Sequence, residues 1–413
     1  MQQNNSLTTD LDHKVGRNFC RFKPRFHVQV LFASIGTIFF YCSSVNATTL
    51  NVPITNLDVD DSMNCVTFDS EERIITITCK TSNLSEISTR LIDQDVLLRD
   101  GEIDKGWVLN AGITIAENAT LHINSTDTSW LKIVSDGETA HPITVLGSLK
   151  IDSVKLTSWD PILNNYATSQ DSDRNGEDVK IGSPRPYIVV ENEATGTTDI
   201  TNSELAYMGY EAGYGEGRTG LRYEGGEGSI VSGNNIHDLY FAFYSRGVGD
   251  IKIENNHIHN NIHYGLDPHT GTHDMIIRNN TIHDNGSIGI ICSVDCYNIV
   301  IVDNKAYNNT NRGIMFSTNM SNSIARNNIV DNENNGIVIS ESNNNEIHNN
   351  IVSNSGSGID IDEDSFGNTV YNNTMINIPG PSEALYLRDG ASEQNMFHNN
   401  TLISITGDRI ILD

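Results

Sequence analysis

The chain has few basic residues. It carries 26 Lys and Arg against 53 Asp and Glu in 413 residues, which gives a formal net charge of -27 at pH 7 with His neutral. Because the backbone of a nucleic acid rewards clustered Lys and Arg, this balance argues against a nucleic-acid partner. A polyanion would have to be met by a local basic site, against the field of the whole protein. We interpret the acidity as solubility outside the cell, with structural calcium as the alternative.

The chain also lacks an apolar run long enough to span a bilayer comfortably, which takes about 20 residues. Its apolar run, residues 27–41, follows five basic residues and precedes the small-residue stretch Ser43–Ala47. This order is typical of a signal peptide. We predict a signal peptide in residues 1–47, or an uncleaved anchor as the alternative, and otherwise a secreted or cell-surface monomer with no stable membrane span.

Cysteines are too few and too scattered for a tetrahedral metal site. Outside the targeting segment, four of the six cysteines form two local pairs, Cys65 with Cys79 and Cys292 with Cys296. An exported chain permits disulfides. No second pair or matched set of histidines completes a metal site around Cys292 and Cys296, so we expect either a disulfide or two buried thiols there.

No metal or cofactor is predicted to be required. The sequence has none of the Gly-Gly-x-Gly-x-Asp nonapeptides that mark some calcium-binding modules, which leaves calcium dependence open. Five histidines gather within one or two repeats without an evident ligand geometry, and we interpret them as surface or groove residues rather than a metal site. They are His257, His259, His263, His273 and His283.

What the chain does have is a repeat. From about residue 225, Asn-Asn or Asp-Asn pairs recur from Asn234-Asn235 to Asn399-Asn400, with second members 21, 24, 24, 24, 22, 23 and 27 residues apart. Short Ile- and Val-rich runs between Asn, Asp and Gly indicate an all-β parallel solenoid with three short strands per coil. We interpret the asparagines as scaffold, because stacked amides can bond along the axis and tolerate the backbone angles of a bend.

The repeat divides the chain into three parts. After the signal peptide we expect irregular first coils and loops in residues 48–224, and regular coils in residues 225–413. Residues Asp160–Ser183 and Gly213–Gly228 are predicted to be loops leaving the coils. A short capping helix is expected near Ser85–Leu98.

One repeat carries a concentration of ionisable side chains, the stretch His263–Asp274. Aligning coils on Gly265 places Leu266 in an apolar, inward-facing column, so that the alternating positions Asp267 and His269 should face solvent. The same alignment puts Tyr244 of the preceding coil beside Asp267. It puts Arg246 beside His269 by the same register.

The block Tyr264-Gly-Leu-Asp-Pro-His269 closely resembles the signature of the mannuronan C5-epimerases. The resemblance is strongest over residues 236–345, where Leu239–Tyr244 and Gly313-Ile-Met-Phe also look like family segments. It implies a right-handed parallel β-helix that converts β-D-mannuronate to α-L-guluronate within an anionic polysaccharide. The matching Tyr and His are the family's proposed acid/base pair, and the Asp belongs to the same motif. Two departures are Thr270, where some relatives have an acidic residue, and the strand Gly289–Asp295, which has no basic side chain.

These residues suit proton abstraction next to a carboxylate. The reaction needs the carboxylate neutralised, a base on one face and a proton donor on the other. We assign the first task to Arg246, the base to His269 and the acid to Tyr264, with His269 and Tyr264 able to exchange roles. Asp267 is expected to orient His269 and hold its tautomer.

Further residues are candidate substrate contacts. Arg312 is the second choice for neutralising the carboxylate, and Arg278 and Lys252 are reserves. The other predicted contacts are Tyr244, His263, Thr272 and His273.

Two alternatives stay open. A polysaccharide lyase shares the abstraction at C5 but expels the C4 oxygen, and the sequence does not separate the two outcomes. A non-catalytic β-helix that binds glycan or assists metal delivery is the second, although a bare scaffold has no need for the combination of Tyr264, Asp267 and His269.

Overall fold

A computed structural model describes residues 64–91, 95–136, 139–168, 184–211, 218–379, 383–387, 391, 394–406 and 410–412. They all belong to one compact unit that extends from Thr55 to the C-terminus. The predicted signal peptide, residues 1–47, lies outside the described residues. No helix in the described part is long and apolar enough to cross a membrane.

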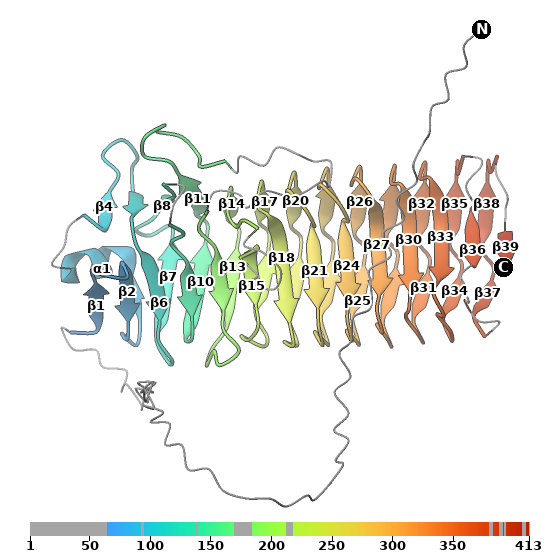
Figure 1. The fold of residues 1–413 in the computed structure, drawn as a ribbon, viewed down its shortest axis with the longest axis horizontal. Coiled ribbons are helices and arrows are strands. Elements are labelled where there is room, and N and C mark those ends of the chain that lie inside the picture. The colour runs from blue at the N-terminus through green and yellow to red at the C-terminus, as the bar shows by residue number, and fades with distance from the viewer. Residues whose placement is uncertain are drawn as a thin grey trace, which may run out of the picture. The chain divides into compact units, whose positions relative to one another are not determined.

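Three β-sheets run side by side along the length of this unit, and we call them sheets A, B and C (Figure 1). Sheet A has 14 described strands: β1 Val66–Asp69, β2 Ile74–Ile77, β6 Gly112–Ile115, β9 Ile143–Val145, β12 Ile188–Val190, β15 Gly220–Tyr223, β18 Phe241–Arg246, β21 Leu266–His269, β24 Ile290–Ser293, β27 Arg312–Ser317, β30 Asn335–Ser340, β33 Ser357–Asp362, β36 Leu385–Leu387 and β39 Ile410–Leu412.

Sheet B has 12: β3 Ser82–Asn83, β7 Thr120–Asn124, β10 Ser148–Asp152, β13 Thr198–Thr201, β16 Ile230–Ser232, β19 Lys252–Glu254, β22 Ile276–Arg278, β25 Val300–Val302, β28 Ile324–Arg326, β31 Glu346–His348, β34 Thr369–Tyr371 and β37 Met396–His398. Sheet C has 13: β4 Leu97–Arg99, β5 Gly106–Leu109, β8 Trp130–Val134, β11 Lys155–Trp159, β14 Glu204–Ala206, β17 Asn235–His237, β20 His257–His259, β23 Thr281–His283, β26 Lys305–Tyr307, β29 Ile329–Asp331, β32 Ile351–Ser353, β35 Thr374–Ile376 and β38 Thr401–Ile403.

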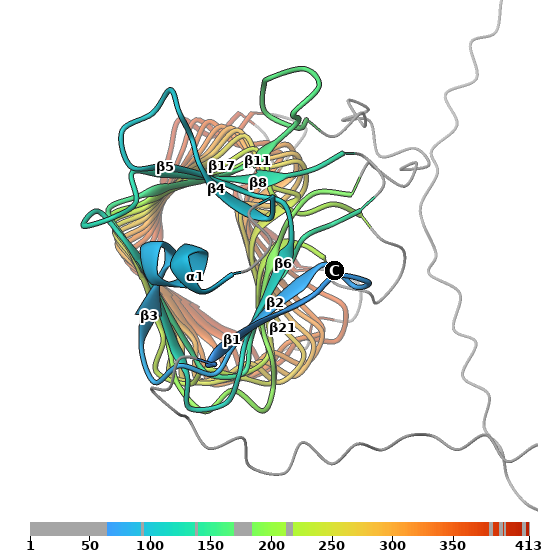
Figure 2. The same ribbon diagram turned by 90° about the vertical axis from the view of Figure 1, so that its left-hand side faces the viewer.

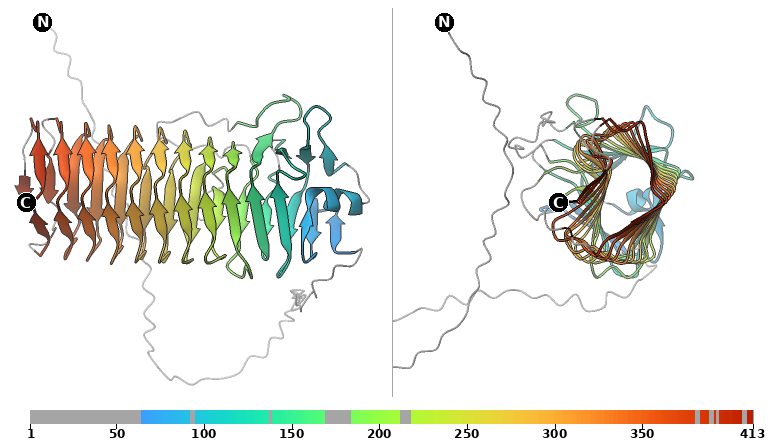
Figure 3. Two further views of the ribbon diagram at one scale, coloured as in Figure 1. Left: turned by 180° about the vertical axis from the view of Figure 1, so that it is seen from behind. Right: turned by 90° about the vertical axis from the view of Figure 1, so that its right-hand side faces the viewer.

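Each regular coil contributes one strand to each sheet. The coil that holds the motif runs from β21 in sheet A through β22 in sheet B to β23 in sheet C. Its strands pair in parallel with those of the coils before and after it. Seen from either end, the coils superimpose as stacked rings (Figures 2 and 3). The prediction of an all-β solenoid with three short strands per coil is confirmed.

The core is a set of apolar columns that run along the axis. The column that begins at Leu266 continues through the neighbouring coils as Ile290, Ile314, Ile337 and Ile359, and every one of these side chains is fully buried. Ile and Val suit such columns because β-branched side chains pack well on a pleated surface. The inward direction predicted for this column is therefore confirmed.

A buried ladder of asparagine amides accompanies the apolar columns. Each amide nitrogen donates to the amide oxygen one coil further on, as Asn280 does to Asn304 at 2.9 Å and Asn304 to Asn328 at 3.1 Å. The first of the predicted pairs differs, because Asn234 rather than Asn235 occupies the ladder. The interpretation of the asparagines as scaffold is otherwise confirmed.

The pairing of two asparagines has its own structural reason. From Asn255-Asn256 onward, the first member of each pair sits at a bend with a positive φ, +58° at Asn255 and +51° at Asn279. Asn and Asp tolerate this left-handed region better than most residues. The first residue thus makes the corner, and the second places its amide in the ladder.

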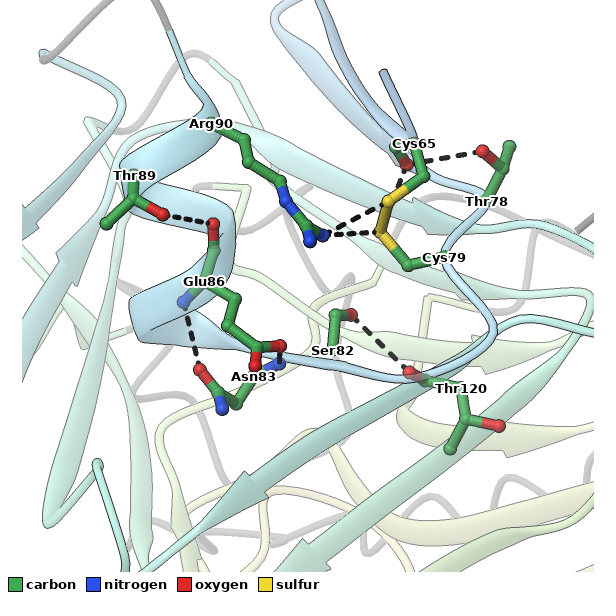
Figure 4. Close-up of a disulfide and its surroundings, with 9 residues drawn as sticks. All are labelled: Cys65, Thr78, Cys79, Ser82, Asn83, Glu86, Thr89, Arg90 and Thr120. Atoms are coloured by element: carbon green, nitrogen blue, oxygen red, sulfur yellow. Dashed lines mark hydrogen bonds between the residues drawn. A yellow bond between two sulfur atoms is a disulfide. The ribbon is translucent and has the colours of Figure 1, made fainter. Parts of the chain in front are cut away.

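The N-terminal end of the stack is closed by the helix α1, Leu84–Arg90 (Figure 2). A capping box of Asn83 and Glu86 starts it, which is the expected signature of a helix N-terminus. The predicted helix near Ser85–Leu98 is present but ends earlier, at Arg90. The Cys65–Cys79 disulfide lies beside α1, and Arg90 approaches both sulfurs at 3.1 and 3.0 Å (Figure 4).

Two other expectations are resolved by the fold. Cys292 and Cys296 are free and buried, so the thiol alternative holds for that pair. Part of the predicted loop Gly213–Gly228 is wrong, because Gly220–Tyr223 forms strand β15 between β12 and β18. Its Gly and Glu content concealed a short buried strand.

Candidate active site

The register inferred for the motif is confirmed. Strand β21 pairs in parallel with β18, which places Tyr244 opposite Asp267 and Arg246 opposite His269. Four of the residues assigned to catalysis or substrate binding therefore lie in two adjacent strands of sheet A. On the other side of β21, strand β24 offers Ser293 opposite His269.

The prediction that Asp267 faces solvent is wrong. Only 3% of this residue is exposed, and its Oδ1 has no hydrogen-bond partner among the described residues. Burial raises the pKa of the Asp267 carboxyl well above its usual value, because the charged form is the one that desolvation penalises. Burial therefore favours the protonated form of Asp267, which can donate a hydrogen bond. Alternation gave its register but not how far the neighbouring side chains cover it.

His269 is half-buried and held by its neighbours. Its Nδ1 lies 2.5 Å from the Thr270 hydroxyl, and its ring stacks on that of Tyr244 with 5.5 Å between centroids. Burial lowers the pKa of His269, and the charge of Arg246 lowers it further. In the tautomer whose Nδ1 donates to the Thr270 hydroxyl, Nε2 keeps a lone pair and the ring is a neutral base. The partner of Nδ1 is the Thr270 hydroxyl, where the sequence had predicted Asp267.

Thr270 also lies at a strained corner. Its φ is +36°, an uncommon value for a β-branched residue. The equivalent positions after β24 and β27, Val294 and Thr318, have φ of +60° and +54°. The strain therefore belongs to this corner of each coil, and what distinguishes Thr270 is its contact with His269.

A chain of aromatic rings connects Tyr264 to His269. The ring of Phe241 lies 4.9 Å from that of Tyr264 and 6.4 Å from that of Tyr244, which stacks on His269. Tyr264 also packs edge-on against His263 at 4.0 Å. Burial lowers the pKa of His263 to about 4, and its buried Nδ1 finds no partner in the described protein. Tyr264 and His269 thus flank a semi-exposed aromatic surface at opposite ends of one strand.

Five arginines lie along sheet A or at the ends of its strands: Arg73, Arg218, Arg222, Arg246 and Arg312. From β2 to β27 they extend over eight strand spacings, or about 38 Å at 4.8 Å each. Within the described residues, no carboxylate forms an ion pair with Arg73, Arg246 or Arg312. We call all five arginines the arginine track. They provide a local basic surface on a protein whose net charge is -27.

Sequence reasoning missed Arg222. It lies opposite Tyr244, over whose ring its guanidinium sits at 5.4 Å, and it forms an ion pair with Glu224. A register shift between β15 and β18 separates it from the regular repeat. Only continued column alignment through that irregular coil would have found it.

Other predicted contacts do not join the site. Thr272 is wrong as a substrate contact, because it is fully buried and its hydroxyl donates to the His269 carbonyl at 2.8 Å. Arg278 and Lys252 lie on β22 and β19 of sheet B, away from the sheet that carries His269. His273 lies at the bend after β21, where it stacks on Tyr297 and contacts Asp274. Arg312, in contrast, lies in the same sheet as His269: it begins β27, and its Nε is buried without a partner in the described part.

The remaining histidines of the predicted cluster, His257, His259 and His283, lie on sheet C, as does His237. His237, His259 and His283 stack in successive coils. The Nε2 atoms of His257 and His283 approach to 2.7 Å. Over the residues that the structure describes, no group of three or more His, Cys, Asp or Glu is arranged to hold a metal ion.

Comparison with known proteins agrees with this architecture. The family model described as a right handed beta helix region matches residues 187–319, 220–375 and 301–402, together more than half of the chain. A double mutant of the periplasmic alginate epimerase AlgG is similar in structure, with a TM-score of 0.65 and 20% identity, covering 82% of this chain and 85% of that one. The A-module of the Azotobacter vinelandii mannuronan C-5 epimerase AlgE4 gives a TM-score of 0.55 and 14% identity, covering 75% and 87%. A search of curated proteins finds no significant match.

Proposed function

We propose, from the premise that this chain belongs to the right-handed β-helix family, that it inverts C5 of β-D-mannuronate residues within an alginate-like polymer. The observation that carries the proposal is the register of β18 and β21, which brings Arg246 beside His269 and Tyr244 beside Asp267 on the sheet of the arginine track. The likeness to alginate epimerases supports the shared fold, and the chemistry is argued from the site.

Each residue has a separate task in this proposal. Arg246 neutralises the uronate carboxylate, and a guanidinium can do so through two parallel hydrogen bonds. His269 removes the C5 proton through Nε2, and Tyr264, at the other end of the aromatic surface, returns a proton to the opposite face. The two residues exchange these roles if the sugar binds the other way round.

Asp267 acts as a hydrogen-bond donor to the substrate rather than as the partner of His269. A protonated carboxyl can donate a hydrogen bond to the negative charge that develops when the C5 proton leaves, as a fixed donor in a partly desolvated site. Its unsatisfied Oδ1 is consistent with a group that awaits a ligand. Arg312, two coils beyond β21, is a second carboxylate contact in the same sheet.

The location follows from the same proposal. An alginate-like polymer is met outside the cytoplasm, and the Cys65–Cys79 disulfide suits an oxidising compartment. We therefore place the protein in the periplasm, at the cell surface or in the medium.

The test is incubation with polymannuronate followed by proton NMR. We expect guluronate signals without shortening of the chains, and deuterium at C5 when the reaction is run in heavy water. New ultraviolet absorbance from unsaturated ends would show a lyase instead. Binding without either product would leave a glycan-binding β-helix.

A further inference from the structure

A cavity of about 460 Å³ lies on the N-terminal side of the candidate active site. Four of its lining residues occupy the amino-terminal edge of successive strands in sheet A: Ile74, Gly112, Pro142 and Tyr187. Gly112 opens space there, because a side chain at that position would approach the Pro142 carbonyl at 3.3 Å.

The edge that lines this cavity leads to Tyr264. Gly220 of β15 pairs with Phe241 of β18, and the amide of Ala242 donates to the Tyr264 carbonyl. The cavity and the candidate acid therefore lie on one line along sheet A. A polymer that passes Tyr264 parallel to the axis continues over the cavity.

The cavity contains a cation held against one aromatic ring, which a second ring contacts. Arg218 Nη1 donates to the Tyr210 hydroxyl at 2.6 Å, and the guanidinium lies 5.6 Å from the centre of that ring. Tyr187 lies 6.4 Å from Tyr210, and its ring is only partly buried. A guanidinium carries five N–H donors, so a contact within the protein and a bidentate contact to a carboxylate can coexist.

His141 is also part of the lining, and a second cation, Arg73, lies near it. Arg73 immediately precedes β2. Burial lowers the pKa of His141, the charge of Asp136 opposes this shift, and the charge of Arg73 adds to it. His141 is 3% exposed, and its lowered pKa favours the neutral imidazole, in which one ring nitrogen donates and the other accepts. Such a group suits a sugar hydroxyl. Glu72, also in the lining, is exposed to solvent.

We infer that Arg218, Tyr210 and Tyr187 form a distal subsite that binds the carboxylate and one ring face of a uronate residue remote from the one that reacts. Arg218 contacts the carboxylate, Tyr210 fixes the guanidinium, and Tyr187 packs against the C–H face of the sugar. This inference rests on the proposed function for the identity of the sugar.

The position of the subsite sets a minimum substrate length. Tyr187 immediately precedes β12, which lies three strands before β21, or about 14 Å away at 4.8 Å per strand. A ligand confined to the reacting residue and its immediate neighbours does not reach it. The subsite therefore acts only on longer chains.

The experiment compares oligomannuronates of increasing length on the intact protein. Binding is measured by calorimetry, and KM and kcat by NMR, for Arg218→Gln and Tyr187→Ala. The matched control is Arg326→Gln, which removes an arginine from β28 of sheet B. Melting temperatures verify that all three variants fold, and Tyr187→Ala provides a second reading if Arg218→Gln does not fold.

For long oligomers we expect Kd and KM to rise roughly 10-fold in Arg218→Gln, as for loss of a charged hydrogen bond, with kcat unchanged. The shortest oligomers that react should show no change, and the control should match wild type at all lengths. If Arg218→Gln changed Kd and KM equally at every oligomer length, or at none, the subsite would be overturned. The proposed function would still stand if the wild type converted the oligomers. Length-dependent binding through Arg218 without any conversion would overturn the function and keep the subsite. A wild type that binds no oligomannuronate would overturn both.

Discussion

The buried asparagine ladder and the motif of the coil from β21 to β23 both contain buried polar groups, but they differ in how those groups are hydrogen-bonded. In the buried asparagine ladder, Asn280 and Asn304 use their amide nitrogens and oxygens in bonds to the neighbouring coils. In the coil that carries the motif, His263 and Asp267 each have a buried polar atom without a partner in the described protein. A buried polar group normally finds a hydrogen bond, and exceptions concentrate at functional sites.

The difference teaches how to separate scaffold from site in a repeat protein. Both sets contain buried polar atoms, so composition and burial alone do not distinguish them. Hydrogen-bond satisfaction does: the ladder is complete without a ligand, and the motif is not. Changes in the ladder should therefore reduce stability and spare chemistry, and changes in the motif should do the reverse.

The largest effect is expected for His269→Ala. Loss of a general base typically lowers turnover by about 10²–10⁴-fold, while the melting temperature should stay near that of the wild type because the ring is only half-buried. The control is Ser317→Ala, which changes the same column two coils away. NMR-monitored turnover and thermal melting measure the two quantities. Full turnover in His269→Ala would remove this residue from the mechanism.

The ladder should give the converse result. Asn304→Ala removes amide bonds to the Ile277 carbonyl at 2.9 Å and to Asn328 at 3.1 Å, and leaves Asn280 without its acceptor. We expect a loss of about 2–4 kcal/mol in unfolding free energy, since unsatisfied buried groups add to the lost bonds. Turnover per folded molecule should not change. The exposed Asn334→Ala is the control for denaturant melts.

Asp267→Asn tests whether the unsatisfied carboxyl is kept for function. The raised pKa means that the carboxyl stabilises the fold most at low pH and loses this contribution as pH rises and the folded group ionises. The neutral amide should therefore gain melting temperature relative to wild type toward alkaline pH. Turnover should fall by roughly 10-fold or more, as when a preorganised donor is removed. A variant that is less stable and fully active would reverse our assignment.

Glu333 accepts a hydrogen bond from an asparagine of a neighbouring coil and also has a buried oxygen without a partner in the described part. It accepts from Asn309 at 2.8 Å, its other oxygen is buried without a partner in the described part, and burial raises its pKa to about 8. Its stabilising contribution is present below pH 4.5, the ordinary value, and is lost as pH rises through about 8. Glu333→Gln should thus be more stable than wild type by about 1–3 kcal/mol above pH 8, with less difference near pH 4. Melting curves across this range would decide it, and equal curves at both ends would contradict it.

The smallest effect concerns the acid limb of the pH profile. Burial and Arg246 both lower the pKa of His269, so the base form should persist below pH 6.5. Arg246→Gln removes the charge of Arg246, so the acid limb of kcat/KM should move to higher pH by a fraction of a unit. KM should also rise. Arg278→Gln on sheet B is the comparison. An acid limb that moves to lower pH would rule out the proposed neighbourhood of Arg246 and His269.

Much of the fold could be predicted because the repeat is local. The spacing of the Asn pairs gave the coil length, and alternation around Leu266 gave the register that pairs Tyr244 with Asp267. Spacing and alternation did not predict the irregular coils. Strand β15 sits in a Gly- and Glu-rich segment, and its register shift concealed Arg222. Thr272 has a residue type suited to sugar contact, but nothing in its neighbours indicated that its hydroxyl would bind a carbonyl three residues back.

The sequence by itself determined the coil, its inward columns and the position of the ionisable cluster, because each depends on residues one strand or one repeat apart. Only the tertiary structure decided how far Asp267 is covered, that Thr270 rather than Asp267 holds His269, and that arginines from coils far apart in the chain line one sheet. The burial of a side chain and the charges that act on it depend on neighbours from several coils, so no single segment of the sequence determines them.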